Sequence, residues 1–258
     1  MKIWFVILIW LMCFAAQAQD ALHYSIANER TTTSRTRARE QYNYNLDLDP
    51  VKLRFNSSLQ AEYNDNVNIA YTNQLDDFIV RPMVGIHAFW QVTERNALDF
   101  SVDLGYEHYF NGARPSHVIV TGDENSGLFF DIYVGSFVID LHDRFSLSQE
   151  TSSDPTISGV AEIFRLENTA GATITCELSK GAITLDYDHL TYAPLDDTYK
   201  YLAHQSDMLA LRPALRVNPA VIAGIELGAG VTVYSDAQLS DNSHTSVGPF
   251  FRYQSSRR

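Results

Sequence analysis

Two acidic residues and a histidine lie within four positions of one another, in the segment Asp186-Tyr187-Asp188-His189. Carboxylate and imidazole groups are the side chains that general acid–base catalysis uses most often. The segment alternates apolar and polar residues, which predicts a strand, and neighbouring side chains of a strand point to opposite faces. Asp186 and Asp188 would share a face that His189 does not, so we expect no catalytic site here.

Motifs for other kinds of chemistry are absent from the sequence. It contains no G-x-S-x-G, no H-E-x-x-H, no Walker loop and no paired cysteine motif. We therefore expect a protein that is not an enzyme and holds neither a cofactor nor a metal. Several acidic residues could bind divalent cations or bridge to lipopolysaccharide, although solvated loop acids are the simpler expectation. These acids are Asp65, Asp76, Asp77, Asp123, Glu124, Asp196 and Asp197.

Charged residues recur at alternate positions of long apolar segments, as Asp99, Asp103 and Glu107 do. This spacing puts them on one face of a strand. If the strands close into a membrane barrel, that face lines its interior, and its excess of acids predicts a preference for cations. The candidate pore-lining residues are Arg54, Arg81, Asp99, Asp103, Glu107, Asp131, Glu167, Glu177, Asp186, Asp188, Arg212, Arg216, Glu226 and Arg252.

Composition limits the class of protein. The chain has 258 residues, of which 45% are hydrophobic, 19% charged and 12% aromatic, and its net charge is −12. The aromatic content argues against disorder, two cysteines cannot make a disulfide scaffold, and the negative charge argues against a nucleic-acid partner. A mean hydropathy near zero argues against a helical membrane bundle but suits both soluble proteins and membrane β-barrels.

The N-terminus predicts export. The apolar run from Ile3 to Ala16 follows Lys2 and precedes an A-x-A pattern, so we expect a signal peptide at 1–18, cleaved near Ala18. Residues 19–50 form a polar lead-in that carries four arginines in its middle. We expect either a solvated periplasmic linker or a basic arm that touches anionic lipid or peptidoglycan. The arginines are Arg30, Arg35, Arg37 and Arg39.

From Val51 onward the apolar residues have a period of two, which predicts an all-β chain. Several of the ten expected strands have the length that a tilted strand needs to cross a bilayer. The expected strands are 51–63, 77–92, 97–110, 127–139, 143–150, 164–178, 182–193, 206–217, 220–234 and 246–254.

The expected connections alternate between long and short. Long loops are predicted at 64–76, 111–126, 151–163, 194–205 and 235–245, and short turns at 93–96, 140–142, 179–181 and 218–219. An up-and-down outer-membrane barrel has this asymmetry, whereas a soluble sandwich with Greek-key crossovers would break it. We therefore predict a barrel at 51–258. Prolines at 82, 213 and 249 argue against central strands, so we expect bulges or shorter strands there.

The segment EYNDNVNIAYTNQLDDFIVRPMVGI, from Glu62 to Ile86, carries the dipeptide Asp65-Asn66, then Asp76-Asp77-Phe78, then Pro82. It resembles the opening hairpin of β-barrel porin families of Gram-negative bacteria, and Gly248 to Gln254 is similar to a later strand of that group. The resemblance implies an outer-membrane, channel-like protein, and some relatives belong to exopolysaccharide systems.

This chain departs from that group at its end. Such barrels commonly finish on an aromatic residue that the barrel-insertion machinery reads, whereas this chain ends YQSSRR. Two expectations follow: either ten strands close a small barrel, or the sequence is part of a longer one, which we favour.

Three functions remain open at this stage. The first is passive solute diffusion or a channel linked to exopolysaccharide export. The second is a non-conducting barrel that assists a surface or export complex, and the least favoured is an outer-membrane enzyme. The expected partners are outer-membrane lipid, lipopolysaccharide, the insertion machinery and a second copy of the chain in a homo-oligomer.

Overall fold

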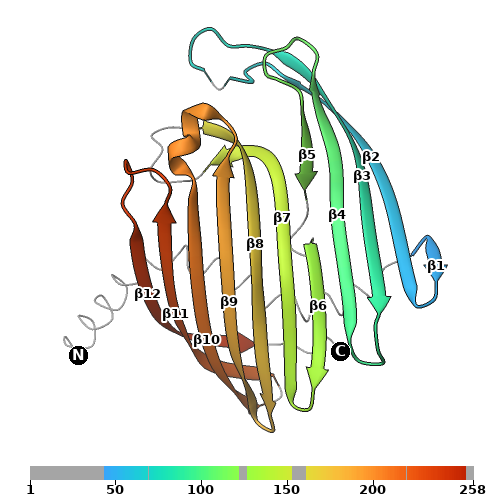
Figure 1. Cartoon of the computed structure of the whole chain (residues 1–258), viewed down its shortest axis with the longest axis vertical. Coiled ribbons are helices and arrows are strands. Elements are labelled where there is room, and N and C mark those ends of the chain that lie inside the picture. The colour runs from blue at the N-terminus through green and yellow to red at the C-terminus, as the bar shows by residue number, and fades with distance from the viewer. Residues whose placement is uncertain (1–43, 69, 122–126, 153–160, 219, 254–258) are drawn as a thin grey trace.

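The computed structural model describes residues 44–68, 70–121, 127–152, 161–218 and 220–253. They form one sheet of twelve antiparallel strands that run up and down in chain order (Figure 1). The prediction of an all-β, up-and-down chain is confirmed, with twelve strands where ten were expected. The predicted signal peptide at 1–18 and the lead-in up to residue 43 lie outside the described residues.

The strands are β1 (Leu46–Leu48), β2 (Val51–Asn64), β3 (Asp77–Gln91), β4 (Ala97–Tyr109), β5 (His117–Thr121), β6 (Gly127–Val134), β7 (Phe137–Ser152), β8 (Ala161–Leu178), β9 (Gly181–Pro194), β10 (His204–Asn218), β11 (Val221–Tyr234) and β12 (Asn242–Tyr253). A short 3-10 helix, η1 (Asp197–Leu202), precedes β10.

Two of the strands share one position in the sheet. Both β5 and β6 lie between β4 and β7, with Val118 opposite Tyr106 and Phe130 opposite Leu98 of β4. They are the two halves of an interrupted strand. The expectation of an unbroken loop over 111–126 is therefore wrong, because β5 lies within it.

The predicted turn at 140–142 is also wrong. The chain reverses at Gly135 and Ser136, and Asp140 and His142 lie within β7. Gly135 has a φ of 60°, a left-handed conformation that glycine adopts without the steric cost of a Cβ. A polar Asp-x-His sequence suggested a turn, but its polar side chains alternate along a continuous strand.

The alternation of connection lengths is borne out. Short connections join β3 to β4, β6 to β7, β8 to β9 and β10 to β11, while the longer ones lie at the opposite end of the sheet (Figure 1). We call these ends the turn end and the loop end. The end of the lead-in also belongs to the sheet, because β1 pairs with the turn-end part of β2.

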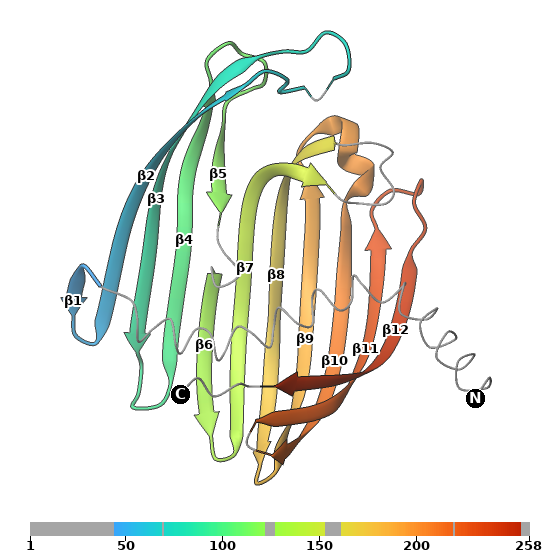
Figure 2. The ribbon, with the colours of Figure 1, turned by 180° about the vertical axis from the view of Figure 1, so that it is seen from behind.

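The sheet is strongly curved, and the turn-end parts of β11 and β12 bend round across its hollow side (Figure 2). Its strand order begins at β1 and ends at β12, and among the described residues no pairing joins these two edges. No helix within the same ranges is long and apolar enough to cross a membrane.

The prolines cause neither bulges nor shorter strands. Pro82 lies opposite Leu59, Pro213 opposite Ile183 and Pro249 opposite Ile225, each in unshifted register. Alternate backbone N–H groups of a strand face opposite neighbours, so a proline removes a bond to one neighbour only. Accordingly, the paired residues of β3 and β4 skip Pro82, and those of β10 and β11 skip Pro213.

The two faces of the sheet differ in an unusual way. Side chains on one face are mostly polar and, outside β2 and the turn end, buried or half-buried, and we call this the inner face. Side chains on the other, outer face are mostly apolar and exposed, the reverse of a soluble sheet. Exposed apolar side chains of the outer face include Val84, Leu104, Leu141, Leu185, Leu209 and Leu227.

Small apolar clusters occur at the loop end. Val67, Ile79 and Tyr109 form one cluster, and Ile163 and Leu202 form another. The buried carboxylate of Asp77 also accepts hydrogen bonds from the backbone N–H groups of Asn111 (2.8 Å) and Ala113 (2.9 Å). The long connections at this end are therefore tied to the strands.

Candidate functional site: the polar inner face

The inner face is organised in rows that cross the strands. In one row, Lys52 lies opposite Phe89, and the succession continues strand by strand to β12. This first row consists of Lys52, Phe89, Asp99, Phe129, His142, Gly171, Asp188, Met208, Gly230 and His244. The second row consists of Gln91, Ala97, Asp131, Asp140, Thr173, Asp186, Ala210, Gly228 and Ser246.

We call these two adjacent rows the acidic band, because they hold five aspartates and one lysine. The aspartates are Asp99, Asp131, Asp140, Asp186 and Asp188. None is more than 5% exposed. Asp131 and Asp140 lie directly opposite each other on neighbouring strands. Burying carboxylates at this density requires counter-charges and hydrogen-bond donors nearby.

His142 bridges two of these aspartates. Its Nδ1 lies 2.8 Å from Asp140 Oδ1, and its Nε2 lies 2.7 Å from Asp188 Oδ1. Carboxylate oxygens accept hydrogen bonds, so both bonds form together only when both ring nitrogens carry a proton. Gly171 makes this bridge fit, because a Cβ there would collide with the Asp188 carboxylate and with the backbone carbonyl of Tyr187.

A second connected group surrounds Asp186. Thr173 Oγ1 donates to Asp186 Oδ1 at 2.5 Å, and Arg212 approaches Asp186 Oδ2 at 3.3 Å. Arg212 is 4% exposed, and its Nε lies 3.9 Å from a carboxylate oxygen of Glu226. Arg212 therefore links the acidic band to the next row towards the turn end.

A third group lies nearer the loop end. Arg81 pairs with Glu62 and Glu107, and His117 Nε2 lies 3.2 Å from Glu107. His87 belongs to the region between this group and the band, with its Nε2 2.8 Å from Asp99 Oδ1. Charged and polar side chains thus bridge β2, β3, β4 and β5 across the inner face.

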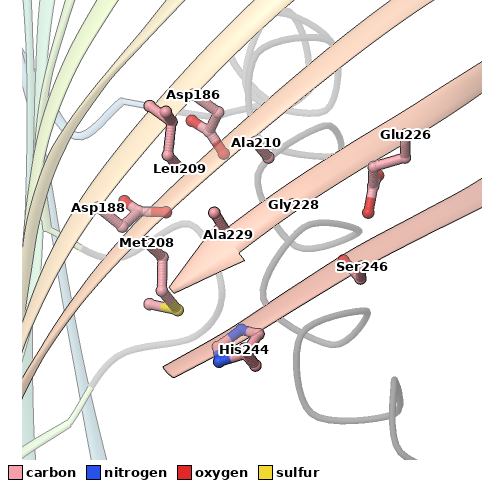
Figure 3. A pocket seen from close by; sticks show the side chains of 10 residues that line it. All are labelled: Asp186, Asp188, Met208, Leu209, Ala210, Glu226, Gly228, Ala229, His244 and Ser246. Carbon is pink, nitrogen blue, oxygen red and sulfur yellow. The ribbon is translucent and has the colours of Figure 1, made fainter. Parts of the chain in front are cut away.

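A hollow lies on the inner face of the last four strands (Figure 3). Asp186 and Asp188 border it on β9, Glu226 on β11, and His244 and Ser246 on β12. Small residues make the hollow. On β11 the band consists of Gly228 and Gly230, and on β10 it has Ala210 beside Met208. The hydroxyl of Ser246 and the ring of His244 on β12 lie over the two glycines.

All fourteen candidate pore-lining residues lie on the inner face, at alternate positions of their strands. The structure connects many of them through the groups described above. Three lie apart at the turn end, where they are exposed: Glu177, Arg216 and Arg252. A role in lining a pore remains a prediction for all fourteen.

Sequence reasoning missed several inner-face residues. Asp140 and His142 were assigned to a turn that the structure places at Gly135 and Ser136. His87 and Thr173 were not singled out, because each lies among largely apolar or uncharged neighbours. The dipeptide Gly135-Ser136 was the sequence signal that could have located this turn correctly. A turn there places Asp140 and His142 on the inner face of the following strand.

The expectation that His189 points away from Asp186 and Asp188 is confirmed. His189 is on the outer face, where its Nδ1 lies 2.9 Å from Asp207 Oδ1, and Tyr187 donates to the same oxygen at 2.7 Å. Among the described residues, no group of three or more His, Cys, Asp or Glu side chains could hold a metal ion.

The loop acids are mostly solvated, with Asp77 as the exception described above. Asp197 of η1 pairs with Lys200, and this hydrogen bond lowers the pKa of the exposed Asp197 carboxyl. Asp123 and Glu124 lie outside the described residues. Comparison with protein-family models finds no match, and comparison with curated proteins finds none either.

Proposed function

We propose that the chain forms a β-barrel of the bacterial outer membrane, with the acidic band and its neighbouring rows facing a channel-like lumen. The observation that supports this best is the reversed burial: most polar inner side chains of β3 to β11 are buried or half-buried, and many large apolar outer side chains are exposed. In water this arrangement would expose a large apolar surface, which monomeric soluble proteins avoid. In a bilayer the same surface contacts lipid.

The outer face of β3 has the extent that a membrane span requires. Its outward positions are apolar without interruption, and an aromatic side chain lies at each end. They are Phe78, Val80, Pro82, Val84, Ile86, Ala88 and Trp90. Twelve residue steps cover roughly 40 Å of strand, or about 30 Å along the membrane normal at the usual tilt of about 40°. This matches the thickness of a bilayer core of about 30 Å.

Three polar side chains of the outer face, those of Asp143, His189 and Asp207, lie in one row across the strands and do not suit lipid. Asp143 lies on the outer face midway along the β7–β8 pair, where it accepts a hydrogen bond from the amide of Asn168. Its neighbour in register on the other side is Leu128, next to the break between β5 and β6. The bond to Asn168 lowers the cost of placing a carboxylate there.

Ten long strands suit closure into a barrel, with the β5–β6 pair counted as one. β2 runs from the turn end to the loop end and β12 runs the opposite way. An antiparallel seam between β12 and the part of β2 beyond Phe55, whose edge β1 and Asn45 do not occupy, therefore has the correct strand direction. An even strand number is typical of bacterial barrels. The resemblance to porin families and the predicted signal peptide favour the same location.

A non-conducting barrel is the second candidate. The ion-paired groups around Arg81, His142 and Arg212 fill much of the inner face, and a small barrel leaves little room beyond its own side chains. In that case the protein would serve as an accessory of a surface or export complex. We assign no reaction and no cofactor to either form.

Two measurements test the proposal. Folded barrels migrate differently on a gel before and after boiling, so we expect a heat-modifiable band from outer-membrane preparations. In planar bilayers we expect conductance with a reversal potential that favours cations, because acids outnumber bases on the inner face. Heat-modifiable protein without conductance would select the accessory barrel. Protein that stays soluble in the periplasm would refute both candidates.

A further inference from the structure

We propose that the arginine-rich segment 30–39 binds the acidic band of its own chain and so occupies the inner face. This inference rests on the proposed function only in calling that face a lumen; the contact itself requires no membrane. The occupant is therefore a named segment of the lead-in, for which sequence reasoning expected a solvated linker or an arm on lipid or peptidoglycan.

The first described residue already lies over the inner face. The ring of Tyr44 stacks on His87, with centroids 5.8 Å apart, and lies 6.4 Å from the ring of Phe89. The ammonium of Lys52 lies 6.0 Å from the centre of the same ring. These three partners are inner-face residues, and Phe89 and Lys52 belong to the first row of the band. Tyr44, which follows the segment in the sequence, therefore lies on the inner side of the sheet.

β1 fixes this point of entry. The backbone N–H of Asn45 donates to Leu53 at 2.9 Å, and the side chain of Asn45 accepts from the N–H of Phe55 at 2.9 Å. Leu46 then pairs with Leu53, and Leu48 with Val51. These bonds hold the end of the lead-in against the edge of β2, next to Lys52, which begins the first row of the acidic band.

The charges of the segment and of the band are complementary. Between positions 30 and 39 the sequence has four arginines and no acidic residue. The band has five buried aspartates against Lys52, with His142 between two of them and Arg212 of the neighbouring row at Asp186. Guanidinium groups suit such a site, because they stay charged and bind carboxylates in a bidentate fork.

The segment is long enough to reach the band. Neighbouring strands lie about 4.8 Å apart, so the six steps from β2 to β9 cover roughly 29 Å. An extended chain advances about 3.3 Å per residue, so Arg39 can lie up to about 17 Å from Tyr44 and Arg30 up to about 46 Å. The four arginines can therefore spread over every aspartate of the band.

Disulfide trapping tests the contact in the full-length protein. In a background with Cys13→Ser and Cys176→Ser, Arg37→Cys is combined with Ser101→Cys, an inner-face position of β4 beside Asp99. The control combines Arg37→Cys with Val102→Cys, the next residue on the outer face. We expect intramolecular cross-linking, identified by peptide mass mapping, at least tenfold higher for the inner position. Equal yields, no inner cross-link in folded protein, or cross-links between two chains would overturn the proposal.

Charge substitutions give a second test outside the strands. Replacing the four arginines by glutamine should lower the midpoint of heat-induced unfolding, because the band loses counter-charges. Replacing them by lysine keeps the positive charges and should leave the midpoint close to that of the wild type. Identical midpoints for wild type and the glutamine variant would refute the contact. A lowered midpoint that appears only with anionic lipid present would instead place the arm on lipid.

Conductance separates this inference from the proposed function. If the barrel conducts, the glutamine variant should conduct more than wild type, because the segment no longer occupies the lumen. Cross-linking at Ser101 without conductance in any variant would retain the inference and refute the channel. Conductance that is the same in both proteins, without cross-linking, would retain the channel and refute the inference.

Discussion

The two halves of the inner face differ in how they are filled. From β2 to β9, charged and aromatic side chains meet across the strands, with His142 between Asp140 and Asp188 and Arg81 between two glutamates. From β10 to β12, the band consists mainly of glycine, alanine and serine, and a hollow lies over it. The same alternation of polar and apolar positions therefore produces two different surfaces. We call the inner face of β2 to β9 the bridged half and that of β10 to β12 the open half.

This difference suggests a division of roles. Buried ion pairs that lose one partner leave an uncompensated charge, so the bridged half should control stability. Small residues leave room for water and ions, so the open half should control passage through a lumen. Substitutions at matched positions of the two halves can break or sharpen this comparison.

The largest effect is expected at His142. Leucine there removes both hydrogen bonds between the imidazole and the buried carboxylates of Asp140 and Asp188, which should cost about 3 kcal/mol or more of unfolding free energy. Urea unfolding in detergent, followed by the fluorescence of Trp90, measures the loss. His244→Leu in the open half is the control, because that ring is exposed. Equal losses in both variants would show that the halves do not differ.

The next effect is steric. Gly171→Val would push a side chain into the Asp188 carboxylate and the Tyr187 carbonyl, and overpacking of this kind costs about 2 kcal/mol. At Gly248 of the open half a Cβ has no neighbour within 4 Å, so Gly248→Val should leave stability nearly unchanged. The same unfolding assay compares the two. A stable Gly171→Val protein would argue against the close contact at β8 and β9.

A third substitution tests the passage of ions through the proposed lumen. Ser246→Trp adds a large ring to the wall of the hollow and should reduce single-channel conductance roughly twofold by narrowing the pore. Val247→Trp, one residue along β12 on the outer face, should leave conductance unchanged and remain compatible with lipid. A reduction in both variants would indicate a general disturbance of β12 and not a local one of the lumen.

The smallest effect concerns selectivity. Glu226→Gln removes one carboxylate beside the hollow and should weaken cation preference slightly, seen as a reversal potential shifted towards zero in a salt gradient. Glu177→Gln is the matched change at the exposed turn end of β8 and should shift it less. A larger shift at Glu177 would place the selective region at the turn end.

Much of the fold could be predicted because strand periodicity is local. A sequence period of two residues is enough to assign Asp99, Asp103 and Glu107 to one face of their strand, and all fourteen candidate residues lie on that face of the sheet. The failures involve the turn at 140–142, the loop that contains β5, and the prolines, which interrupt no strand. The reversal at Gly135 and Ser136 depends on one glycine conformation, and polar residues such as Asp140 resembled a turn more closely than the dipeptide did.

The sequence alone determined the all-β class, the alternation of short and long connections, the common face of the charged residues and the opposite orientation of His189, since each follows from neighbours along the chain. Only the tertiary structure decided that His142 bridges Asp140 and Asp188 and that β5 and β6 share one position. It also decided that the polar face is the buried one. These features depend on the register between distant strands and on the curvature of the sheet, and alternation within a strand carries no information about either.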